Sequence, residues 1–509
     1  MRVQEPPLNA HRERWSTALR RSEFAEMFSL PQQPLWRRAA RAAAWVFALR
    51  VLEKGLALIR TVVLARLLLP RGFGLFAIVL IAVSALELVN LNGLRAALIQ
   101  KHDDSRRDLD TVWSVLFIQN CLNAALFLIF AQPIAQFFGE PAAAGLIRAF
   151  SIALLLEALV SIGTIHFEKR MLLHRQFTFV LSGAAIDFVV AIAVAIAYRT
   201  VWALVAGAIA GRLARLLASY MLQDYRPALR IKWHSFRHLF RFEGWMWVSA
   251  ALWFLLLQGD NIFVGKVFGI TALGVYTVAY SIASITRTDI VAVLQRLMFP
   301  SFSSILSDQA QLRAGYLKLL RGTALCVVPV SVGLAALASE VSTVLLGPGW
   351  GTAGPVLSVL ALLGALQILA ANAGTLLRAM GHPRQATLSE VIFVIVSAAL
   401  LIPLASKLHL VGVAWAMTIG AAAGWAWAER AVLRVLNISF RELLHTFESS
   451  VAAALVMLAS LYLFRGVFPQ VNWVSLATTI AGSGLMYLAT VAVAALSRQR
   501  TLKPDAAAN

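Results

Sequence analysis

The sequence has few cysteines, few charges and few acidic residues, and each shortage excludes a class of protein. Its two cysteines, Cys121 and Cys326, both lie in apolar runs, so we expect no disulfide framework. Charged residues make up 14% of the chain, whereas soluble domains carry about 25%. A G-x-x-x-x-G-K-[ST] loop and a Cys/His cluster of metal-ligand spacing are both absent. We therefore expect no nucleotide hydrolysis by that mechanism, no metal and no other cofactor.

Apolar residues are abundant instead, at 60% of the chain with a mean hydropathy of +0.75. Fourteen apolar stretches are long enough to cross a bilayer as helices. They lie near residues 42–64, 72–94, 111–131, 145–165, 178–198, 200–222, 243–264, 272–295, 319–340, 356–378, 386–406, 409–430, 448–466 and 474–497. The sequence predicts an all-α polytopic membrane protein with about 14 transmembrane helices.

The basic residues are distributed unevenly along the chain. The 45 Lys and Arg outnumber the 25 Asp and Glu, and most of them lie in the N-terminal tail and in every second loop. This is the positive-inside pattern, and it predicts that both termini are cytoplasmic. The Arg-rich residues 1–41 contain no apolar core of signal-peptide length, so we expect an uncleaved tail. The net charge thus reflects topology, and we expect no nucleic-acid partner.

Motifs of the first half recur in order in the second half. The pairs are LARLLLPRGFGLF (64–76) with VGKVFGITALGVY (264–276), FFGEPAAAG (137–145) with LLGPGWGTAG (345–354), HRQFT (174–178) with PRQAT (383–387), and WALVAGAIAG (202–211) with WAMTIGAAAG (415–424). Six spans separate the members of each pair, so both copies keep one orientation. This predicts two six-helix bundles related by a pseudo-twofold axis along the membrane normal, with two extra C-terminal helices.

The repeat and the loops divide the chain into six segments. These are a cytoplasmic tail (1–41), an N-lobe with spans 1–6 (42–222), a cytoplasmic linker (223–242), a C-lobe with spans 7–12 (243–435), spans 13–14 (436–497) and a cytoplasmic C-terminal tail (498–509).

The first predicted span contains an unusual group of charges in the stretch RVLEKGLALIR. Its members, Arg50, Glu53, Lys54 and Arg60, fall within an arc of about 120° on a helix. Each charge costs roughly 2.5–3.5 kcal/mol at a bilayer centre unless it faces protein, water or a charged ligand. Two interpretations fit: Glu53 neutralises its neighbours in a structural cluster, or the basic excess forms the cationic wall of a central cavity.

The 200-residue offset of the repeat aligns Arg60 with Asp260. Two pseudo-symmetric helices would then carry opposite charges at matched depth, and their pairing could latch the lobes shut on the outside. Alternatively, Asp260 caps a kink near Gly259. The other intramembrane acids, which include Glu157 and Asp187, are either local ion-pair partners or binding sites for a coupling ion.

Several motifs together resemble a known family. LARLLLPRGFGLFAIVL resembles the ARLL-x-P-x-x-x-G-L-F signature of bacterial polysaccharide transporters. Further matching stretches are GLRAALIQKHD (93–103), HFEKRMLLHRQF (166–177), LQGDNIFVGKVFGITALGVYTVAYSIA (257–283), LMFPSFSSI (297–305) and LLGPGWGTAGPVL (345–357). As an ordered set they resemble the Wzx-like oligosaccharide flippases of the multidrug/oligosaccharidyl-lipid/polysaccharide exporter superfamily.

The resemblance implies a transporter rather than an enzyme. It implies that an undecaprenyl-pyrophosphate-linked oligosaccharide repeat unit is moved from the cytoplasmic to the periplasmic leaflet of the bacterial inner membrane by alternating access, for exopolysaccharide or lipopolysaccharide biosynthesis. The implied partners are that lipid-linked substrate, the bilayer, an H+ or Na+ gradient, and neighbouring polysaccharide polymerase and glycosyltransferase proteins. Spans 13 and 14 would form a groove for the polyprenyl tail.

Only three residues are carried over from the resemblance; the other candidates below follow from the repeat and from what a sugar substrate needs. Arg50, Lys54 and Arg60 are the candidates for binding the pyrophosphate, whose charge arginine pairs well. Glu53 and Asp260 are candidates for the lobe latch or for ion coupling. Polar and aromatic residues near the seventh and eighth spans are candidates for sugar contact, namely Gln258, Asn261, Tyr276 and Tyr280.

Three rival functions stay open from the sequence. One is a scaffold that recruits glycosyltransferases, which would place the function in the N-terminal tail and the 223–241 loop. A drug or cation antiporter of the same superfamily needs an acidic, aromatic cavity, whereas the first span here has a basic excess. A membrane enzyme of polysaccharide assembly usually carries its catalytic residues on a sizeable periplasmic loop, whereas the predicted outer connections are short.

Overall fold

The computed structural model describes residues 35–87, 106–169, 172–230, 244–284, 308–467 and 472–502, together with Leu94, Leu98 and Gln470. Contacts divide the chain into two compact units, Met1–Ala48 and Leu49–Asn509. The described part of the first unit is the beginning of helix α3. Everything that follows concerns the second unit.

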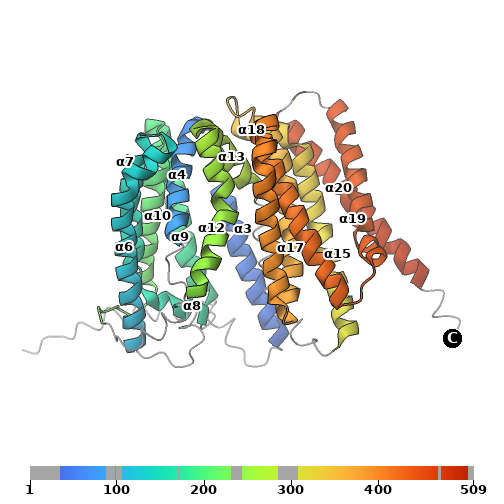
Figure 1. Cartoon of the computed structure of the whole chain (residues 1–509), viewed down its shortest axis with the longest axis horizontal. Coiled ribbons are helices and arrows are strands. Elements are labelled where there is room, and N and C mark those ends of the chain that lie inside the picture. Colours follow the sequence, from blue (N-terminus) through green and yellow to red (C-terminus); the bar gives the residue numbers. More distant parts are fainter. Residues whose placement is uncertain are drawn as a thin grey trace, which may run out of the picture. The chain divides into compact units, whose positions relative to one another are not determined.

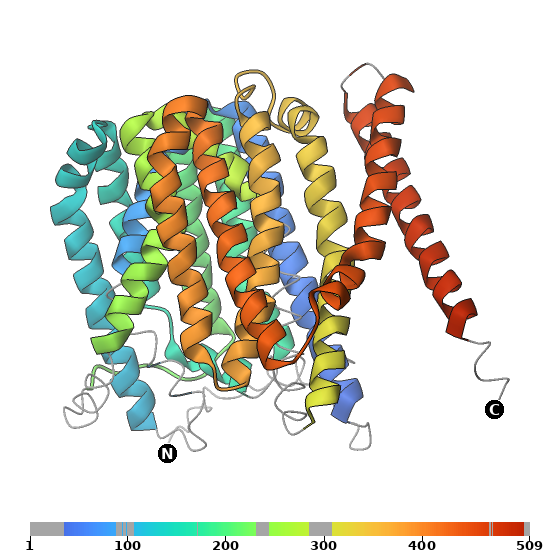
Figure 2. The same cartoon turned by 45° about the vertical axis from the view of Figure 1, so that its right-hand side comes forward.

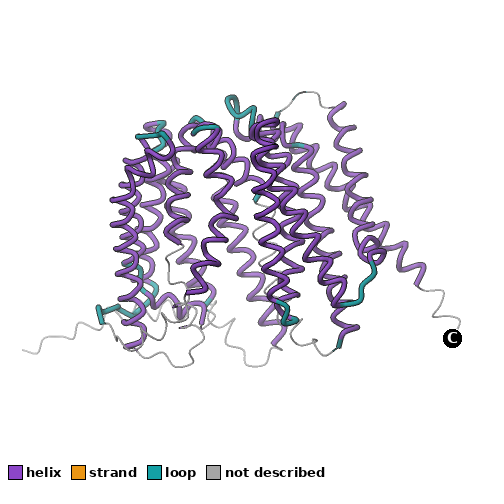
Figure 3. The backbone as a smooth tube through the Cα atoms, in the orientation of Figure 1, coloured by secondary structure: helices purple, strands orange, loops and turns teal. Residues whose placement is uncertain are grey.

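Every regular element in the described part of the chain is a helix, which confirms the predicted all-α class (Figure 3). The elements are α3 (Leu35–Leu67), α4 (Pro70–Glu87), α6 (Arg106–Phe138), α7 (Ala142–Ala158), η1 (Ile162–Thr164), α8 (Ile165–Lys169), α9 (Leu173–Tyr198), α10 (Trp202–Met221), α12 (Gly244–Val267), α13 (Ile270–Ala283), α15 (Gln309–Ala336), α16 (Ala338–Val341), η2 (Ser342–Leu346), α17 (Ala353–Ala379), α18 (Pro383–Val435), α19 (Phe440–Val467) and α20 (Trp473–Leu502).

Each of the fourteen predicted spans coincides with one of these helices over at least part of its length. The predicted spans 386–406 and 409–430 both fall in α18, which is broken at His409, where φ is 51° and ψ is −130°. By length and composition alone, eight helices of the described residues can cross a membrane, or nine if the bent pair Ala142–Ala158 and Ile162–Lys169 is one span. This number is smaller than the fourteen predicted spans partly because α18 counts once. In addition, α4 and α13 are described over only 18 and 14 residues.

We call α3–α10 from Leu49 onward the N-lobe and α12–α18 the C-lobe. Within the N-lobe α9 packs along α10 and α6 along α7, and within the C-lobe α17 packs along α18. Across the lobes, α4 packs against α13 (Figure 1). The last two helices, drawn in red, pair with each other at one edge and contact α15 (Figure 2).

The α4–α13 contact repeats the internal symmetry of the sequence. A Cβ atom on Gly74 would lie 1.9 Å from the carbonyl oxygen of Ile270, and one on Gly274 would lie 1.9 Å from that of Pro70. The two glycines and the two acceptors are both 200 residues apart, as the repeat predicts. Only glycine permits such close backbone approach. Each lobe therefore contributes one glycine and one carbonyl oxygen to the interface.

Candidate functional site

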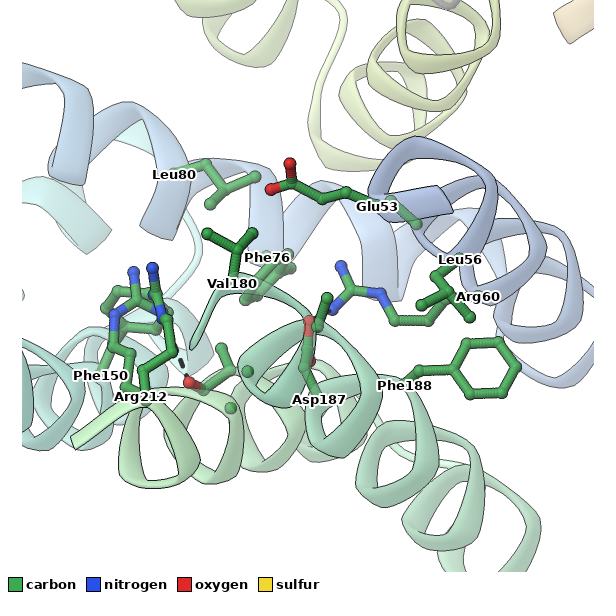
Figure 4. Close-up of a pocket in the computed structure, with 16 residues that line it drawn as sticks. Glu53, Leu56, Arg60, Phe76, Leu80, Phe150, Val180, Asp187, Phe188 and Arg212 are labelled. Atoms are coloured by element: carbon green, nitrogen blue, oxygen red, sulfur yellow. Dashed lines mark hydrogen bonds and ion pairs between the residues drawn. The ribbon is translucent and has the colours of Figure 1, made fainter. Parts of the chain in front are cut away.

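A cavity of about 310 Å³ lies within the N-lobe, between α3, α4, α7, α9 and α10 (Figure 4). Its apolar wall includes Phe76, Leu80 and Phe150. Its charged lining residues are Glu53, Arg60, Asp187, Arg212 and Arg215. Arginines in a bilayer-spanning bundle are costly unless they are paired or face water or a ligand, so their convergence marks this cavity as the candidate functional site.

Arg60 of α3 faces Asp187 of α9, and its guanidinium donates to the carboxylate in an ion pair. Small residues on the neighbouring helix hold Asp187 in place. A Cβ atom on Gly207 would lie 2.5 Å from Oδ1 of Asp187, and one on Gly211 would lie 2.8 Å from its Cβ. The spacing Gly207-x-x-x-Gly211 thus lets α10 pack closely on α9 at the depth of the ion pair.

The opposite side of the cavity carries a second ionic group. Arg215 of α10 lies 3.4 Å from the carboxylate of Glu157 on α7, and Nε of Arg212 lies 4.0 Å from it. The Arg212 guanidinium also lies over the ring of Phe150, 4.9 Å from its centroid. Arg212 and Arg215 are three residues apart, so they share one face of α10 and point to the same partner.

The polar atoms of these groups are incompletely satisfied by protein. Nε of Arg60, Nε of Arg212 and Oδ1 of Asp187 are buried atoms without a hydrogen-bond partner. Buried N–H groups normally have an acceptor, and an unpaired one costs about 1–3 kcal/mol. Two guanidinium donors at the cavity wall therefore lack a protein acceptor in this structure. Oxygens of an anionic ligand are the acceptors that such donors pair with most strongly.

The structure places the predicted cationic wall as follows. Arg60 and Glu53 line the cavity, whereas Lys54 is half-buried beside it and is not a lining residue. The side chain of Arg50 lies outside the described residues. Of the three predicted pyrophosphate ligands, the structure therefore brings Arg60 to the cavity.

The structure does not bring Arg60 and Asp260 together as the predicted latch. Arg60 pairs with Asp187 inside the N-lobe, and Asp260 on α12 accepts a hydrogen bond of 2.8 Å from the hydroxyl of Tyr276 on α13. Arg60 and Asp260 are aligned by the repeat, but the alignment could not specify that each has a nearer partner in its own lobe.

The predicted sugar-contact residues are occupied by protein contacts in this state. The Tyr276 side chain is fully buried and stacks at 6.5 Å on Tyr280. Nε2 of Gln258 donates to Oγ of Ser84 across the lobes at 3.1 Å, and Oε1 of Gln258 accepts from the buried Asn261 amide at 3.0 Å. None of these four predicted residues lines the cavity. A sugar cannot reach Tyr276 until α12 and α13 move.

Arg212 and Arg215 were not predicted as site residues, although the sequence carries a signal for them. They lie in GRLAR (211–215), inside the last apolar run of the N-lobe and directly after the Gly207-x-x-x-Gly211 spacing. Two arginines three residues apart on a span with packing glycines indicate a buried basic face. Their acidic partner Glu157 lies 55 or more residues away, so spacing alone does not reveal it.

The fold is that of a class of multi-helix membrane transporters. The chain superposes on a lipid II flippase, MurJ in an inward closed conformation, with a TM-score of 0.69 and 14% identity, covering 88% of this chain and 98% of that one. It also superposes on an inward-facing multidrug resistance MATE family transporter with a TM-score of 0.62 and 14% identity, covering 76% of this chain and 96% of that one.

The sequence comparison then identifies the family. The profile described as "polysaccharide biosynthesis protein" matches residues 63–355. This chain belongs to that family, which confirms the resemblance found in its motifs.

Individual relatives agree. The succinoglycan biosynthesis transport protein ExoT of Rhizobium meliloti (strain 1021) is 26% identical, over 64% of this chain and 66% of its own length. The lipopolysaccharide biosynthesis protein WzxC of Escherichia coli (strain K12) is 25% identical, over 68% and 70%. The teichuronic acid biosynthesis protein TuaB of Bacillus subtilis (strain 168) is 26% identical, over 57% and 60%. The matched region thus spans roughly two thirds of these relatives.

Proposed function

We propose that this protein flips an undecaprenyl-pyrophosphate-linked oligosaccharide from the cytoplasmic to the periplasmic leaflet of the bacterial inner membrane. The observation that carries the proposal is the cavity containing Arg60, Arg212 and Arg215 inside a transporter fold. A pyrophosphate bears about two negative charges that cannot enter hydrocarbon bare. The guanidinium groups replace its water, and the family membership supports a glycan as the rest of the cargo.

The ionic groups of the cavity give the proposal a mechanism. In the structure Arg60 pairs with Asp187 and Arg215 pairs with Glu157. An entering pyrophosphate exchanges with these carboxylates and accepts from the unpaired Nε groups of Arg60 and Arg212. The released carboxylate then needs a cation, and an H+ or Na+ taken from a transmembrane gradient supplies both that charge and the free energy of transport.

The charge of the cavity also separates the rival functions. A drug or cation antiporter would need an acidic cavity wall, whereas three guanidinium groups line this one against the two carboxylates of Glu53 and Asp187. The polyprenyl tail stays in lipid when the cavity opens sideways, with α19 and α20 as its groove. Both termini are cytoplasmic in this proposal, and polymerase and glycosyltransferase proteins consume and supply the substrate.

Flipping by single alanine variants tests the proposal. Losing one charge-assisted hydrogen bond costs about 1.5–3 kcal/mol, and 1.4 kcal/mol is about tenfold in a binding constant. We expect Arg60→Ala and Arg212→Ala each to slow the appearance of lipid-linked oligosaccharide in the periplasmic leaflet at least about tenfold. Arg50→Ala and Lys54→Ala test the remaining predicted ligands in the same assay.

The matched control is Arg71→Ala. Arg71 also forms an ion pair within the N-lobe, at 3.0 Å to Glu140, but does not line the cavity. All variants are compared at equal membrane abundance. Unchanged flipping in Arg60→Ala, Arg212→Ala and Arg215→Ala would show that the cavity does not serve the pyrophosphate.

A further inference from the structure

Two basic side chains related by the repeat bridge the lobes at the same end of the bundle. We call this the distal end, where α3 passes into α4 and α12 into α13. Arg66, at the end of α3, donates through Nε to the carbonyl oxygen of Leu345 at 2.9 Å. It also donates through Nη2 to the carbonyl oxygen of Val344. Lys266, at the end of α12, donates to the carbonyl oxygen of Phe137 at 2.6 Å.

The acceptors are related by the same repeat as the donors. Arg66 and Lys266 are 200 residues apart, and the segments that hold Phe137 and Leu345 are the second repeated motif, FFGEPAAAG and LLGPGWGTAG. Each donor comes from the first helix of one lobe. The acceptor Phe137 lies at the end of the third span of the N-lobe, and Leu345 lies in η2, directly after the third span of the C-lobe. Both acceptors lie at helix C-terminal ends, where carbonyl groups lack intrahelical donors and attract cations.

Further contacts seal the distal end beside these two bridges. Trp350, which is 1% exposed, donates from Nε1 to the carbonyl oxygen of Ala65 at 3.0 Å and packs edge-on against Phe73. The close approach of Gly74 and Gly274 lies at the N-terminal turns of α4 and α13, directly after the bridges. The distal end is therefore closed by two repeat-related bridges, two repeat-related glycine contacts and the contacts of Trp350.

We propose that Arg66 and Lys266 are gate residues, whose two bridges to helix-end carbonyls hold the distal end shut and must break once in every transport cycle. This rests on the proposed function, since it makes the distal end the periplasmic gate of an alternating-access cycle. The bridges replace the Arg60–Asp260 latch expected from the sequence. They use the same two helices and the same offset, six residues further along.

The two bridges are not chemically identical. Arg66 makes two hydrogen bonds and also lies over the ring of Trp473 on α20, at 5.2 Å. Lys266 makes one hydrogen bond and lies over the ring of Phe137 at 4.8 Å. Both side chains are exposed, and exposed charge interactions are individually weak. The double variant is therefore the decisive one.

Access of a cysteine reporter to the cavity tests the gate without requiring transport. The reporter is Leu80→Cys, because Leu80 lines the cavity and is 45% exposed. Cys121 and Cys326 are first replaced by serine. Intact cells are labelled from the periplasmic side with a membrane-impermeant maleimide. We expect slow labelling of the parent and about tenfold faster labelling of the Arg66→Ala/Lys266→Ala variant, equivalent to about 1.4 kcal/mol.

Two comparisons distinguish a gate from a general loss of structure. Arg71→Ala removes an ion pair within one lobe, so its labelling should match the parent. Among variants changed at position 266 alone, Lys266→Arg keeps a cation at the site, so the reporter should be labelled as slowly as in the parent. Labelling of the double variant no faster than that of Arg71→Ala, or fast labelling of the parent itself, overturns the proposal.

The outcome is independent of the pyrophosphate assignment. Flipping that survives loss of the cavity arginines would end that assignment, yet the labelling experiment would still report whether Arg66 and Lys266 close the distal end. Conversely, a failed labelling test leaves the flipping experiment on Arg60 and Arg212 unaffected.

Discussion

Adding one methyl group at the closest interlobe contact, in Gly274→Ala, should open the distal end. The new Cβ atom would lie 1.9 Å from the carbonyl oxygen of Pro70, 2.8 Å from its carbonyl carbon and 2.9 Å from the amide nitrogen of Gly74. Nonbonded heavy atoms prefer about 3.5–4.0 Å, so α4 and α13 must separate by roughly 1.5 Å. All three obstructing atoms are backbone, so no side chain can rotate away.

The magnitude follows from the cost of overpacking. Extra methyl groups in well-packed interiors cost about 1–3 kcal/mol. Under the gate proposal that cost falls on the closed state alone, because α4 and α13 separate when the distal end opens. A shift of about 2 kcal/mol corresponds to roughly 30-fold in the ratio of open to closed molecules. Gly74→Ala should give a similar shift, since its Cβ atom meets Ile270 at the same distance.

The assay is periplasmic labelling of Leu80→Cys, together with the thermal midpoint in detergent. Gly322→Ala is the control, because a Cβ atom at Gly322 in α15 meets nothing within 4 Å. Alanine there should leave labelling unchanged and stabilise the helix by up to about 1 kcal/mol. Equal labelling rates and equal midpoints for Gly274→Ala and Gly322→Ala would refute the reasoning.

Two further predictions concern hydrogen bonds outside the cavity. Trp350→Phe removes the donor to the Ala65 carbonyl and should lower the thermal midpoint and speed labelling of the reporter; a midpoint equal to that of the parent would contradict this. Tyr225 lies in the segment after α10 and donates a hydrogen bond to the buried carboxylate of Asp110. The pKa of its phenol is raised well above the usual 10.0, mainly because of burial and secondly because of this hydrogen bond. Since the folded pKa exceeds the unfolded one, the added stability exists below about pH 10 and is lost as the pH rises further. The difference in midpoint between parent and Tyr225→Phe should therefore be constant to about pH 9 and shrink above about pH 10, and a difference that grows there would contradict the assignment.

The helices were predictable because a bilayer span requires a continuous apolar run, and such runs are visible without any knowledge of packing. The break at His409 was also visible, as a polar interruption between two runs. The repeat predicted two related lobes, but the helix pair it suggested across them, α3 with α12, is not the pair that packs most closely, which is α4 with α13. Each of these signals is local or periodic in the sequence.

The ionic partners were harder to predict, because they depend on how helices rotate and cross. Asp187 is 127 residues from Arg60, and glycines on a third element set its position. The distal bridges were missed for a different reason. Their acceptors are backbone carbonyls at helix ends, and every residue type carries a backbone carbonyl. A charge pair is visible in the sequence only between Arg60 and Asp260, six residues before Arg66 and its aligned position, Lys266.

The glycine contact between α4 and α13 has the form of a homodimer interface, in which one patch meets a copy of itself. In a true homodimer one glycine and one acceptor serve both contacts, so a single substitution alters two contacts at once. In this chain each contact has its own glycine and its own acceptor. The acceptors differ, Pro70 and Ile270, while both contacts use glycine. One half of the interface can therefore be changed by mutation while the other half is kept.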